Sequence, residues 1–438
     1  MTQFNRRAVI AGSALTLGAM VSPPTNAQTS AAPSPQAPMG KTATESVIQR
    51  MIKRAQENLH PIGFDGKSFS GAGWDILVSE GRSSEFFLLG EEHGIAEIPV
   101  LTGSLFEALQ PAGFDKLAIE LSSPIADDLD EAARLGTNGL RDYFEKYPPG
   151  PAFYFWRSEA ELLAKARGLV PHDEQAIWGL DYEVIGDRQL IERLKSKAPH
   201  SARAALDALD KASLDGWARW KAEKNPEFLP MFSLKPELVN AVQIAWKSPD
   251  RQSAVILDVL VETLEINLLQ QTTGWGSNKR RADFNRKSLI RLLTEGKAKK
   301  PRKILFKFGS THTMRGVTWA GIFDVGSLAA EVAALRGGKS FHLLVGGGAN
   351  STHGVLDATD MSVKTQPVDM IGDEFGMAFL LDVMPKAGLG LLDLRPLRRL
   401  ASSAERLKEL NNPEAVRVIH AYDMMLVWNG STATTMLG

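Results

Sequence analysis

The sequence predicts an α/β fold with a mostly parallel central sheet flanked by helices, and with an α-helical insertion that caps one edge of the sheet. Short apolar runs of strand length alternate with stretches of helical periodicity along the chain. These runs are apolar throughout, which is typical of strands that are buried on both faces of a parallel sheet. Between about residues 188 and 298, helical patterns follow one another with few strand signals, which indicates the insertion.

Each predicted strand is a short apolar run that is followed by polar or glycine residues. In chain order the runs are residues 85–89, 116–121, 176–181, 303–308, 340–345, 377–383 and 424–428. The helices predicted within the insertion are residues 202–214, 234–246, 254–269 and 279–293. A chain of 438 residues is long enough for one large α/β domain that contains such an insertion.

The N-terminus has the parts of a secretory signal. Arg6 and Arg7 precede a weakly apolar run, residues 8–21, and a small-residue stretch that ends at Ala27. The paired arginines favour the twin-arginine export route, and the run is shorter than the ~20 residues that span a bilayer. We therefore expect a signal peptide at residues 1–27, a disordered linker at 28–44 and the folded domain at 45–438. The protein is then periplasmic or secreted, and the twin-arginine export machinery is one of its partners.

The composition excludes several classes of function. The formal net charge is −1 and no basic stripe is present, so we expect no nucleic-acid partner. The chain has no cysteine, which excludes disulfides, thiol nucleophiles, zinc–thiolate sites and a lipid-anchored N-terminus. After the signal, no apolar run is long enough to span a membrane. We therefore expect no stable membrane insertion, and a small molecule as the substrate.

Side chains capable of acid–base chemistry follow four of the predicted strands, at the point where each strand ends. Because the carboxyl ends of parallel strands meet at one edge of a sheet, we expect these side chains to lie together there. A lone histidine after a strand is more often structural than catalytic, so the joint occurrence is what indicates a site. In chain order the strand ends supply Glu91, His93 and Glu97, then Glu120, then Asp181, and finally His312 and Arg315.

These residue types indicate a hydrolase whose active site lies at the edge that the insertion caps. His93, with a near-neutral pKa, accepts a proton from water, and Glu91 or Glu120 orients its ring. His312 or Arg315 stabilises the developing oxyanion. In an alternative mechanism, His93, Glu120 and His312 hold a divalent metal ion with an open position for water. Carboxylate and imidazole suit either mechanism, so both stay open.

Neighbouring features add further expectations. If a helix begins at His93, Glu97 lies one turn further along the same face. The aromatic residues 153–156 either line a pocket for an apolar substrate or pack in the core. Neither a Gly-x-Ser-x-Gly elbow nor a His-Glu-x-x-His helix is present, which disfavours a serine nucleophile and the common zinc proteases. Among the other histidines, His353 in a glycine-rich loop is a further candidate.

At these residues the chain resembles the erythromycin esterase family, within the wider group that includes the ChaN-like haem-binding proteins and the TIKI proteases. The first signature, residues 88–94 with Glu97, is the most specific of the matching segments. One residue fewer separates Glu from His here than in the esterases, and Gly309 stands where they carry a further histidine. The other segments follow in family order along most of the folded chain: residues 118–120, 156–159, 179–181, 280–293, 311–312 and 422–426.

The resemblance implies hydrolysis of an ester or lactone bond, with His93 as the general base for water and with Glu91 and His312 in support. No cofactor is required in this interpretation. The alternatives are a ChaN-like periplasmic protein that binds haem or iron, and the metal-dependent hydrolase described above. The residues expected to contact the substrate are Glu97, Trp156, Asp181 and Arg315.

Overall fold

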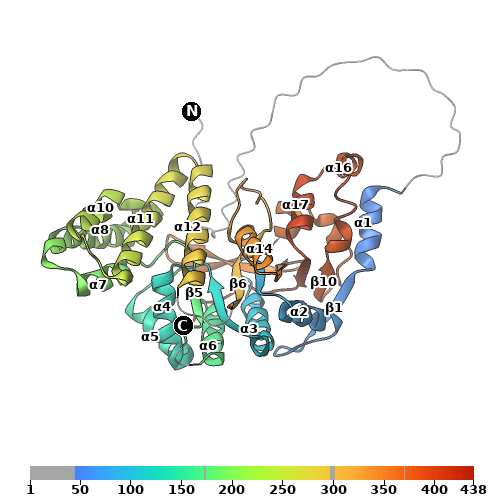
Figure 1. Ribbon diagram of the computed structural model, residues 1–438, viewed down its shortest axis with the longest axis horizontal. Coiled ribbons are helices and arrows are strands. Elements are labelled where there is room, and N and C mark those ends of the chain that lie inside the picture. The colour runs from blue at the N-terminus through green and yellow to red at the C-terminus, as the bar shows by residue number, and fades with distance from the viewer. Residues whose placement is uncertain (1–44, 172–173, 296–300, 369) are drawn as a thin grey trace, which may run out of the picture.

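The computed structural model describes residues 45–171, 174–295, 301–368 and 370–438 of the chain (Figure 1). The predicted signal peptide and linker lie outside these residues. The described part forms a large sheet with helices on both faces and a group of helices at one end (Figure 1). The predicted α/β fold class is confirmed.

The large sheet has nine strands in the order β2-β1-β10-β11-β7-β3-β6-β4-β5. The neighbouring strands from β11 to β5 are parallel, and β10, β1 and β2 extend the other end as antiparallel strands. A separate hairpin pairs β8 with β9. The strands are β1 Leu59–Phe64, β2 Phe69–Ser70, β3 Phe86–Glu91, β4 Phe114–Ile119, β5 Ile177–Gly179, β6 Lys303–Gly309, β7 Ser340–Gly347, β8 Thr352–Asp357, β9 Ser362–Pro367, β10 Gly388–Asp393 and β11 Met424–Asn429.

The central strands are buried because they carry apolar side chains on both faces. Every residue of β3 is buried, and Leu88 lies between Phe306 of β6 and His342 of β7 in the ladder. Successive side chains point to opposite faces, so Phe87 packs in one hydrophobic cluster and Leu88 in another. This arrangement explains why the sequence shows continuous apolar runs here.

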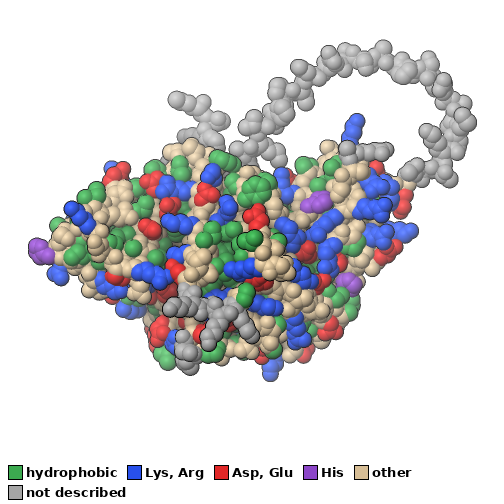
Figure 2. Space-filling view, viewed as in Figure 1, with side chains coloured by type: hydrophobic (Ala, Val, Ile, Leu, Met, Phe, Trp, Pro, Cys, Tyr) green, Lys and Arg blue, Asp and Glu red, His purple; other side chains and the backbone are tan. Residues whose placement is uncertain are grey.

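Helices cover both faces of the sheet. The helices α2, α3 and α6 lie on one face, and α12 and α14 lie on the other (Figure 1). Charged side chains of both signs are intermixed over the surface seen in Figure 2. Within the described residues, no helix is long and apolar enough to cross a membrane. The helices outside the insertion are α1 Val47–Gln56, α2 Ala72–Arg82, α3 Glu97–Leu109, α4 Ser123–Ala132, α5 Gly136–Lys146, α6 Arg157–Leu169, α13 Ser310–Thr313, α14 Val325–Leu335, α15 Ala378–Leu381, α16 Ala404–Leu410 and α17 Pro413–Ala421.

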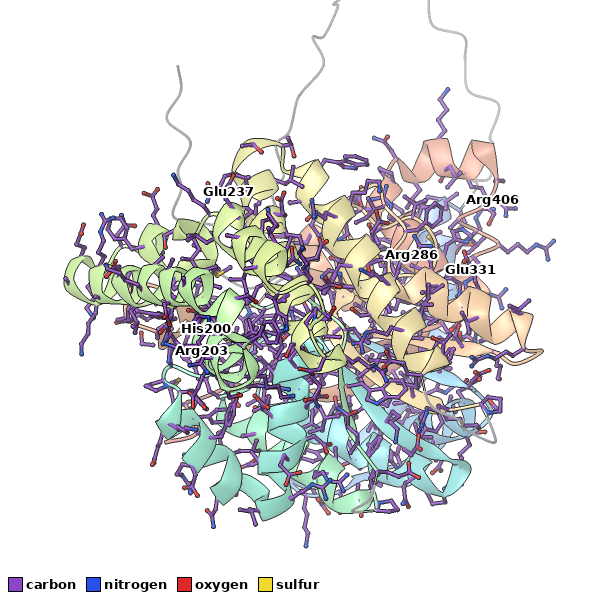
Figure 3. All side chains as sticks on the ribbon, turned by 60° about the vertical axis from the view of Figure 1, so that its left-hand side comes forward. His200, Arg203, Glu237, Arg286, Glu331 and Arg406 are labelled. Atoms are coloured by element: carbon purple, nitrogen blue, oxygen red, sulfur yellow. The ribbon has the colours of Figure 1, made fainter. Side chains whose placement is uncertain are left out.

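Helices fill the described part of the chain between β5 and β6. Asp250 caps the long helix α11, because its carboxylate accepts hydrogen bonds from the backbone N–H groups of Gln252 and Ser253. The next helix, α12, packs against α11 and returns over the sheet (Figure 1). His200 and Arg203 lie on α8 in this outer group (Figure 3). The helices here are α7 Asp187–Lys197, α8 His200–Glu223, α9 Pro230–Ser233, α10 Pro236–Ala245, α11 Arg251–Thr272 and α12 Trp275–Thr294.

One predicted strand is wrong. Residues 377–383 contain the short helix α15, whose apolar side chains pack in a cluster with α1 and α17. Periodicity does not distinguish a short apolar strand from a short buried helix. The strand in this part of the chain lies further on, at β10, where glycine interrupts the apolar pattern.

Candidate active site

His93 lies in a tight turn that joins β3 to α3. The strand ends at Glu91, Gly94 adopts a φ of 84°, and the helix begins only at Glu97. A Cβ atom at Gly94 would overlap the carbonyl oxygen of Gly354, so glycine is what allows this turn to pack against β8. His93 therefore precedes the helix, and the expectation that it shares a helix face with Glu97 is wrong.

Glu91 and Phe153 fix the ring of His93. Its Nδ1 lies 2.9 Å from Glu91 Oε1, and the Phe153 ring stacks on the imidazole with centroids 4.7 Å apart. The other ring nitrogen, Nε2, is buried and has no hydrogen-bond partner in the described chain. It faces Glu120 Oε2 at 3.4 Å, which is too long for a good hydrogen bond. The carboxylate at Nδ1 orients the ring, so Nε2 is the nitrogen left for chemistry.

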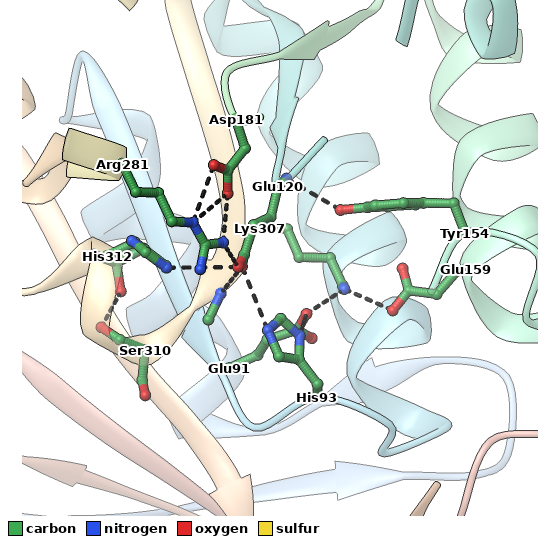
Figure 4. Close-up of polar contacts among 12 residues, drawn as sticks. Glu91, His93, Glu120, Tyr154, Glu159, Asp181, Arg281, Lys307, Ser310 and His312 are labelled. Atoms are coloured by element: carbon green, nitrogen blue, oxygen red, sulfur yellow. Dashed lines mark hydrogen bonds and ion pairs between the residues drawn. The ribbon is translucent and has the colours of Figure 1, made fainter. Parts of the chain in front are cut away.

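A second histidine is held in the same way from the opposite side. His312 lies on α13, directly after β6, and its Nδ1 is 2.7 Å from Asp324 Oδ2. Its Nε2 lies 3.5 Å from Glu120 Oε1, the second oxygen of the carboxylate that faces His93. Two carboxylate–histidine pairs thus direct their Nε2 atoms at one shared carboxylate (Figure 4).

Glu120, directly after β4, is the centre of this cluster. Its Oε2 accepts a hydrogen bond from the Gly309 N–H at 2.6 Å, and its Oε1 accepts one from Arg281 at 2.5 Å. Its own backbone N–H donates to the Tyr154 hydroxyl at 3.1 Å. A Cβ atom at Gly309 would lie 2.9 Å from His93 Nε2, so the glycine keeps a side chain out of the space between the histidine and Glu120.

The carboxylates favour the protonated form of both histidines. Burial lowers the pKa of His93, but the charges of Glu120 and Glu91 outweigh burial and raise this pKa to about 10. Burial also lowers the pKa of His312, yet Asp324 and Glu120 raise it overall. Burial raises the pKa of Glu120, but His93 and His312 hold it well below its usual range. The carboxylates therefore favour the imidazolium form of His93 and raise its pKa above the near-neutral value expected from the sequence.

A buried lysine extends the network behind His93. The Nζ atom of Lys307, in the middle of β6, lies 2.6 Å from Glu91 Oε1 and 2.7 Å from Glu159 Oε1. Burial raises the pKa of Glu159 to about 7, against the pull of Lys307. Burial also opposes ionisation of Glu91, but Lys307 and His93 lower its pKa. Lys307 therefore keeps the carboxylate that orients His93 ionised.

A cleft opens between the insertion and the segment that follows β6. Arg281, His312 and Asp324 supply its charged groups, and His93 is not among its lining residues. Figure 2 shows hydrophobic side chains gathered in the middle of the molecule, where α12 approaches α14. The apolar part of the cleft lining comes from Tyr182, Ile266, Trp319 and Ile322.

The residues around Glu120 do not fit a divalent metal ion. Glu120, Asp181 and His312 have ligand atoms within 4.8 Å of one another, so this set differs from the predicted one by Asp181 in place of His93. The guanidinium of Arg281 lies among these atoms, with Nη2 at 2.5 Å from Glu120 Oε1 and at 2.5 Å from Asp181 Oδ2. A protein cation already fills the position between the two carboxylates.

Haem does not fit this arrangement either. His93 Nε2 is the nitrogen free for an axial bond, and it faces Glu120 and the backbone of Gly309. Even a methyl group on Gly309 would lie only 2.9 Å from this nitrogen, which leaves no plane for a porphyrin.

Two residues expected to contact the substrate, Glu97 and Arg315, serve the fold elsewhere. Glu97 accepts hydrogen bonds from the Thr432 N–H at 3.0 Å and from its hydroxyl at 2.7 Å. Arg315 pairs with Asp423 at 2.8 Å. Neither residue lines the cleft.

The other two, Trp156 and Asp181, are buried and support groups of the site. Trp156 is buried and packs edge-on against Phe153, the ring that stacks on His93. Asp181 is buried and binds the guanidinium of Arg281. The aromatic segment 153–156 therefore packs in the core and supports the His93 ring.

Sequence reasoning missed Asp324, Lys307 and Glu159. Lys307 had a signal, since a lysine inside an apolar strand requires a buried partner. Glu159 ends the 156–159 segment, and nothing in the sequence indicates its partner. Asp324 is the N-cap of α14, a position that the sequence pattern can suggest, but its contact with His312 depends on the fold. His353 donates from Nδ1 to the carbonyl oxygen of His93 at 3.1 Å, so this further candidate supports the turn.

No protein-family model matches the sequence, and a search of curated proteins gives no match. Solved structures do match. One is an erythromycin esterase mutant, EreC in its open conformation. Its TM-score is 0.54, with 14% identity over 83% of this chain and 94% of that one. The chain has the erythromycin esterase fold. A protein from Bacillus cereus shares this fold at 13% identity, with a TM-score of 0.56 over 89% of this chain and 99% of that one. A succinoglycan biosynthesis protein shares the fold at 12% identity, with a TM-score of 0.54 over 91% of this chain and 100% of that one.

Proposed function

We propose that the protein is a hydrolase of an ester or lactone bond, with His93 as the general base that activates water. The observation that carries the proposal is the pair of buried histidines whose Nε2 atoms face Glu120, His93 at 3.4 Å and His312 at 3.5 Å. A carboxylate at Nδ1 orients each ring, so both Nε2 atoms are held at one place at the carboxyl edge of the sheet, as acid–base chemistry requires. The likeness to an erythromycin esterase supports this class of reaction at the level of the fold.

The proposed reaction uses groups on both sides of Glu120. The neutral form of His93, whose population grows as the pH rises toward the raised pKa, takes a proton from water at Nε2. The water oxygen bonds to the carbonyl carbon at the same time, and the carbonyl oxygen gains the negative charge. Protonated His312, which lines the cleft, stabilises this oxyanion. The intermediate then expels the alcohol, which takes the proton back from His93. Glu91 holds the ring in place throughout, from 2.9 Å.

A hydrolysis screen against simple esters, lactones and macrolides tests the proposal. His93→Ala should lower turnover by ~10²–10⁴-fold, the usual contribution of a general base, with an unchanged circular dichroism spectrum. The matched control is His200→Ala, an exposed histidine on α8 (Figure 3), which should hydrolyse at the rate of the parent protein. An unchanged rate in the His93 variant would contradict the mechanism, and no hydrolysis of any substrate by the parent would contradict the function.

We also propose export by the twin-arginine route, which rests on the pattern of residues 1–27. In a bacterial host that has this machinery, the full chain should reach the periplasm. Replacing Arg6 and Arg7 by lysine should retain it in the cytoplasm, as fractionation would show. Export of the lysine variant at the parent level would contradict the twin-arginine route.

A further inference from the structure

Arg281 reaches from α12 into the centre of the cluster. Its Nε lies 3.1 Å from both carboxylate oxygens of Asp181, and its Nη2 bridges Asp181 and Glu120 at 2.5 Å each (Figure 4). The side chain is buried, and the guanidinium lies 4.9 Å from the centre of the Tyr182 ring. One guanidinium thus balances two buried carboxylates that come from the ends of β4 and β5.

The atoms that Arg281 holds have the spacing of a metal site. One ligand atom each from Glu120, Asp181 and His312 lies within 4.8 Å of the others. Carboxylate oxygens and an imidazole nitrogen are common ligands of divalent ions. The guanidinium is a permanent cation whose planar fork matches carboxylates, so it neutralises the same oxygens without an ion.

Arg281 is one of the residues that line the cleft. The hydrogen bonds of Arg281 to described residues come from Nε and Nη2, which leaves the N–H groups of Nη1 without a protein acceptor. Arg281 lines the cleft together with His312, Thr311 and Asp324. The free N–H groups are therefore available to a ligand that offers an oxygen.

We propose that Arg281 takes the place of a divalent cation in this site, and that its Nη1 edge stabilises the charge that develops on the substrate carbonyl oxygen. The second half of the proposal rests on the proposed hydrolase function, whereas the first half concerns the chain alone. Arg281 then supplies what a metal ion gives in other hydrolases, a positive charge fixed beside the reacting carbonyl.

Metal binding tests the first half without any substrate. Arg281→Ala removes the guanidinium and should create a site that binds one Mn²⁺ per chain in calorimetry, with a Tm that rises on addition of MnCl2. The parent protein and Arg280→Ala should show neither effect, because Arg280 is a surface residue of the same helix that pairs with Glu262 and Glu265. Binding of Mn²⁺ by the parent at the same affinity, or its absence from the folded alanine variant, would overturn this half.

A lysine variant covers the case in which the alanine variant does not fold. Arg281→Lys keeps a positive charge between the carboxylates but lacks the fork and the second edge. It should bind no Mn²⁺, like the parent. Mn²⁺ binding by the lysine variant at the level expected for an open site would contradict the claim that a side-chain cation blocks the ion.

Kinetics on any ester found in the screen tests the second half. Loss of one oxyanion donor lowers kcat by ~10²–10³-fold, so Arg281→Ala should lose kcat with little change in KM, and added guanidinium should restore part of the loss. Arg280→Ala should match the parent. A change confined to KM, or a rate equal to the parent, would overturn the oxyanion role. If the parent hydrolyses no ester, the proposed function fails, while the Mn²⁺ result still decides the first half.

Discussion

The charge of Glu120 sets the protonation state of His93, and Glu120→Gln tests this directly. The substitution keeps the size of the side chain and removes its charge, while Glu91 still holds Nδ1 at 2.9 Å. Arg281 retains Asp181 as a partner, so the substitution leaves no buried charge without a counter-charge. The predicted result is a lower pKa for His93.

The size of the effect follows from the pKa of His93 in the folded protein. A value of about 10 in place of 6.5 means that the surroundings favour the imidazolium by about 5 kcal/mol. Burial opposes the charge, so Glu120 and Glu91 together supply more than this, and Glu120 supplies the larger share. One opposite charge at this distance shifts a pKa by ~1–3 units, so we expect a fall of that size in the glutamine variant.

Histidine-labelled protein gives the measurement. Two-bond ¹H–¹⁵N correlations follow both ring nitrogens of His93 as the pH is raised, in the parent and in Glu120→Gln. Glu183→Gln is the matched control, because Glu183 is also buried, burial raises its pKa to about 7, and its carboxylate accepts a hydrogen bond from the Ser122 hydroxyl, away from His93. In the kinetic assay, the alkaline rise in rate that a general base at His93 requires should move to lower pH by the same amount.

The same shift has a consequence for stability. The pKa of His93 is higher in the folded than in the unfolded chain, so the imidazolium stabilises the fold fully below pH ~6.5 and this contribution is lost as the pH rises to about 10. The glutamine variant should lose less stability over this range in urea denaturation. A His93 pKa that is equal in the parent and in Glu120→Gln, or near-neutral in both, would refute the reasoning.

Three further substitutions test other parts of the network. Gly309→Ala places a Cβ atom 2.9 Å from His93 Nε2. It should lower kcat at least ~10-fold and lower the free energy of unfolding in urea by about 1–3 kcal/mol. Full activity would contradict the close approach. Lys307→Met removes the shared cation of two buried carboxylates and leaves Glu159 without a counter-charge, while Glu91 keeps His93, so it should cost about 3–5 kcal/mol. Lys303→Met, at the start of the same strand, should stay within ~0.5 kcal/mol, and equal losses would argue against a buried ion pair. Arg315→Ala should lower Tm and leave KM unchanged, and a raised KM would instead place this residue in the substrate site.

The sheet and the location of the site follow from the sequence because both depend on short-range patterns. Glu91, Glu120, Asp181 and His312 each stand at or just after the end of an apolar run, and the runs become β3, β4, β5 and β6. The structure places these strands side by side in the order β3-β6-β4-β5, so their carboxyl ends meet. The rule for parallel sheets then brings the four side chains to one edge.

The antiparallel end of the sheet gave no such pattern. The strand β1 contains Pro61 and Gly63, and only one of its residues, Ile62, is buried. The strand β10 has glycine at two of its positions. Proline and glycine break the apolar run in both strands, so neither shows the continuous pattern that identified the parallel strands, although each pairs with neighbours in the sheet.

Arg281 could not be assigned from the sequence because its role depends on the rotation of one helix. Arg280 and Arg281 are adjacent on α12, and nothing local distinguishes them. The structure turns Arg280 toward Glu262 on the surface and Arg281 toward Asp181 in the core. That rotation is set by the packing of α12 against α11 and the sheet, which joins segments about 100 residues apart.

The protonation of His93 lies beyond sequence reasoning for a different reason. Its pKa is the balance of a large penalty for burial and two larger gains from Glu120 and Glu91, and spacing along the chain fixes none of these. The backbone of Gly309 completes the arrangement, because its N–H holds Glu120 at 2.6 Å while its missing side chain leaves room between His93 Nε2 and that carboxylate, 3.4 Å away. A Cβ atom at position 309 would lie 2.9 Å from that nitrogen and 3.2 Å from Glu120 Oε2, so a side chain there would crowd both groups. Glycine therefore keeps the space between His93 and Glu120 open, as the proposed reaction at Nε2 requires.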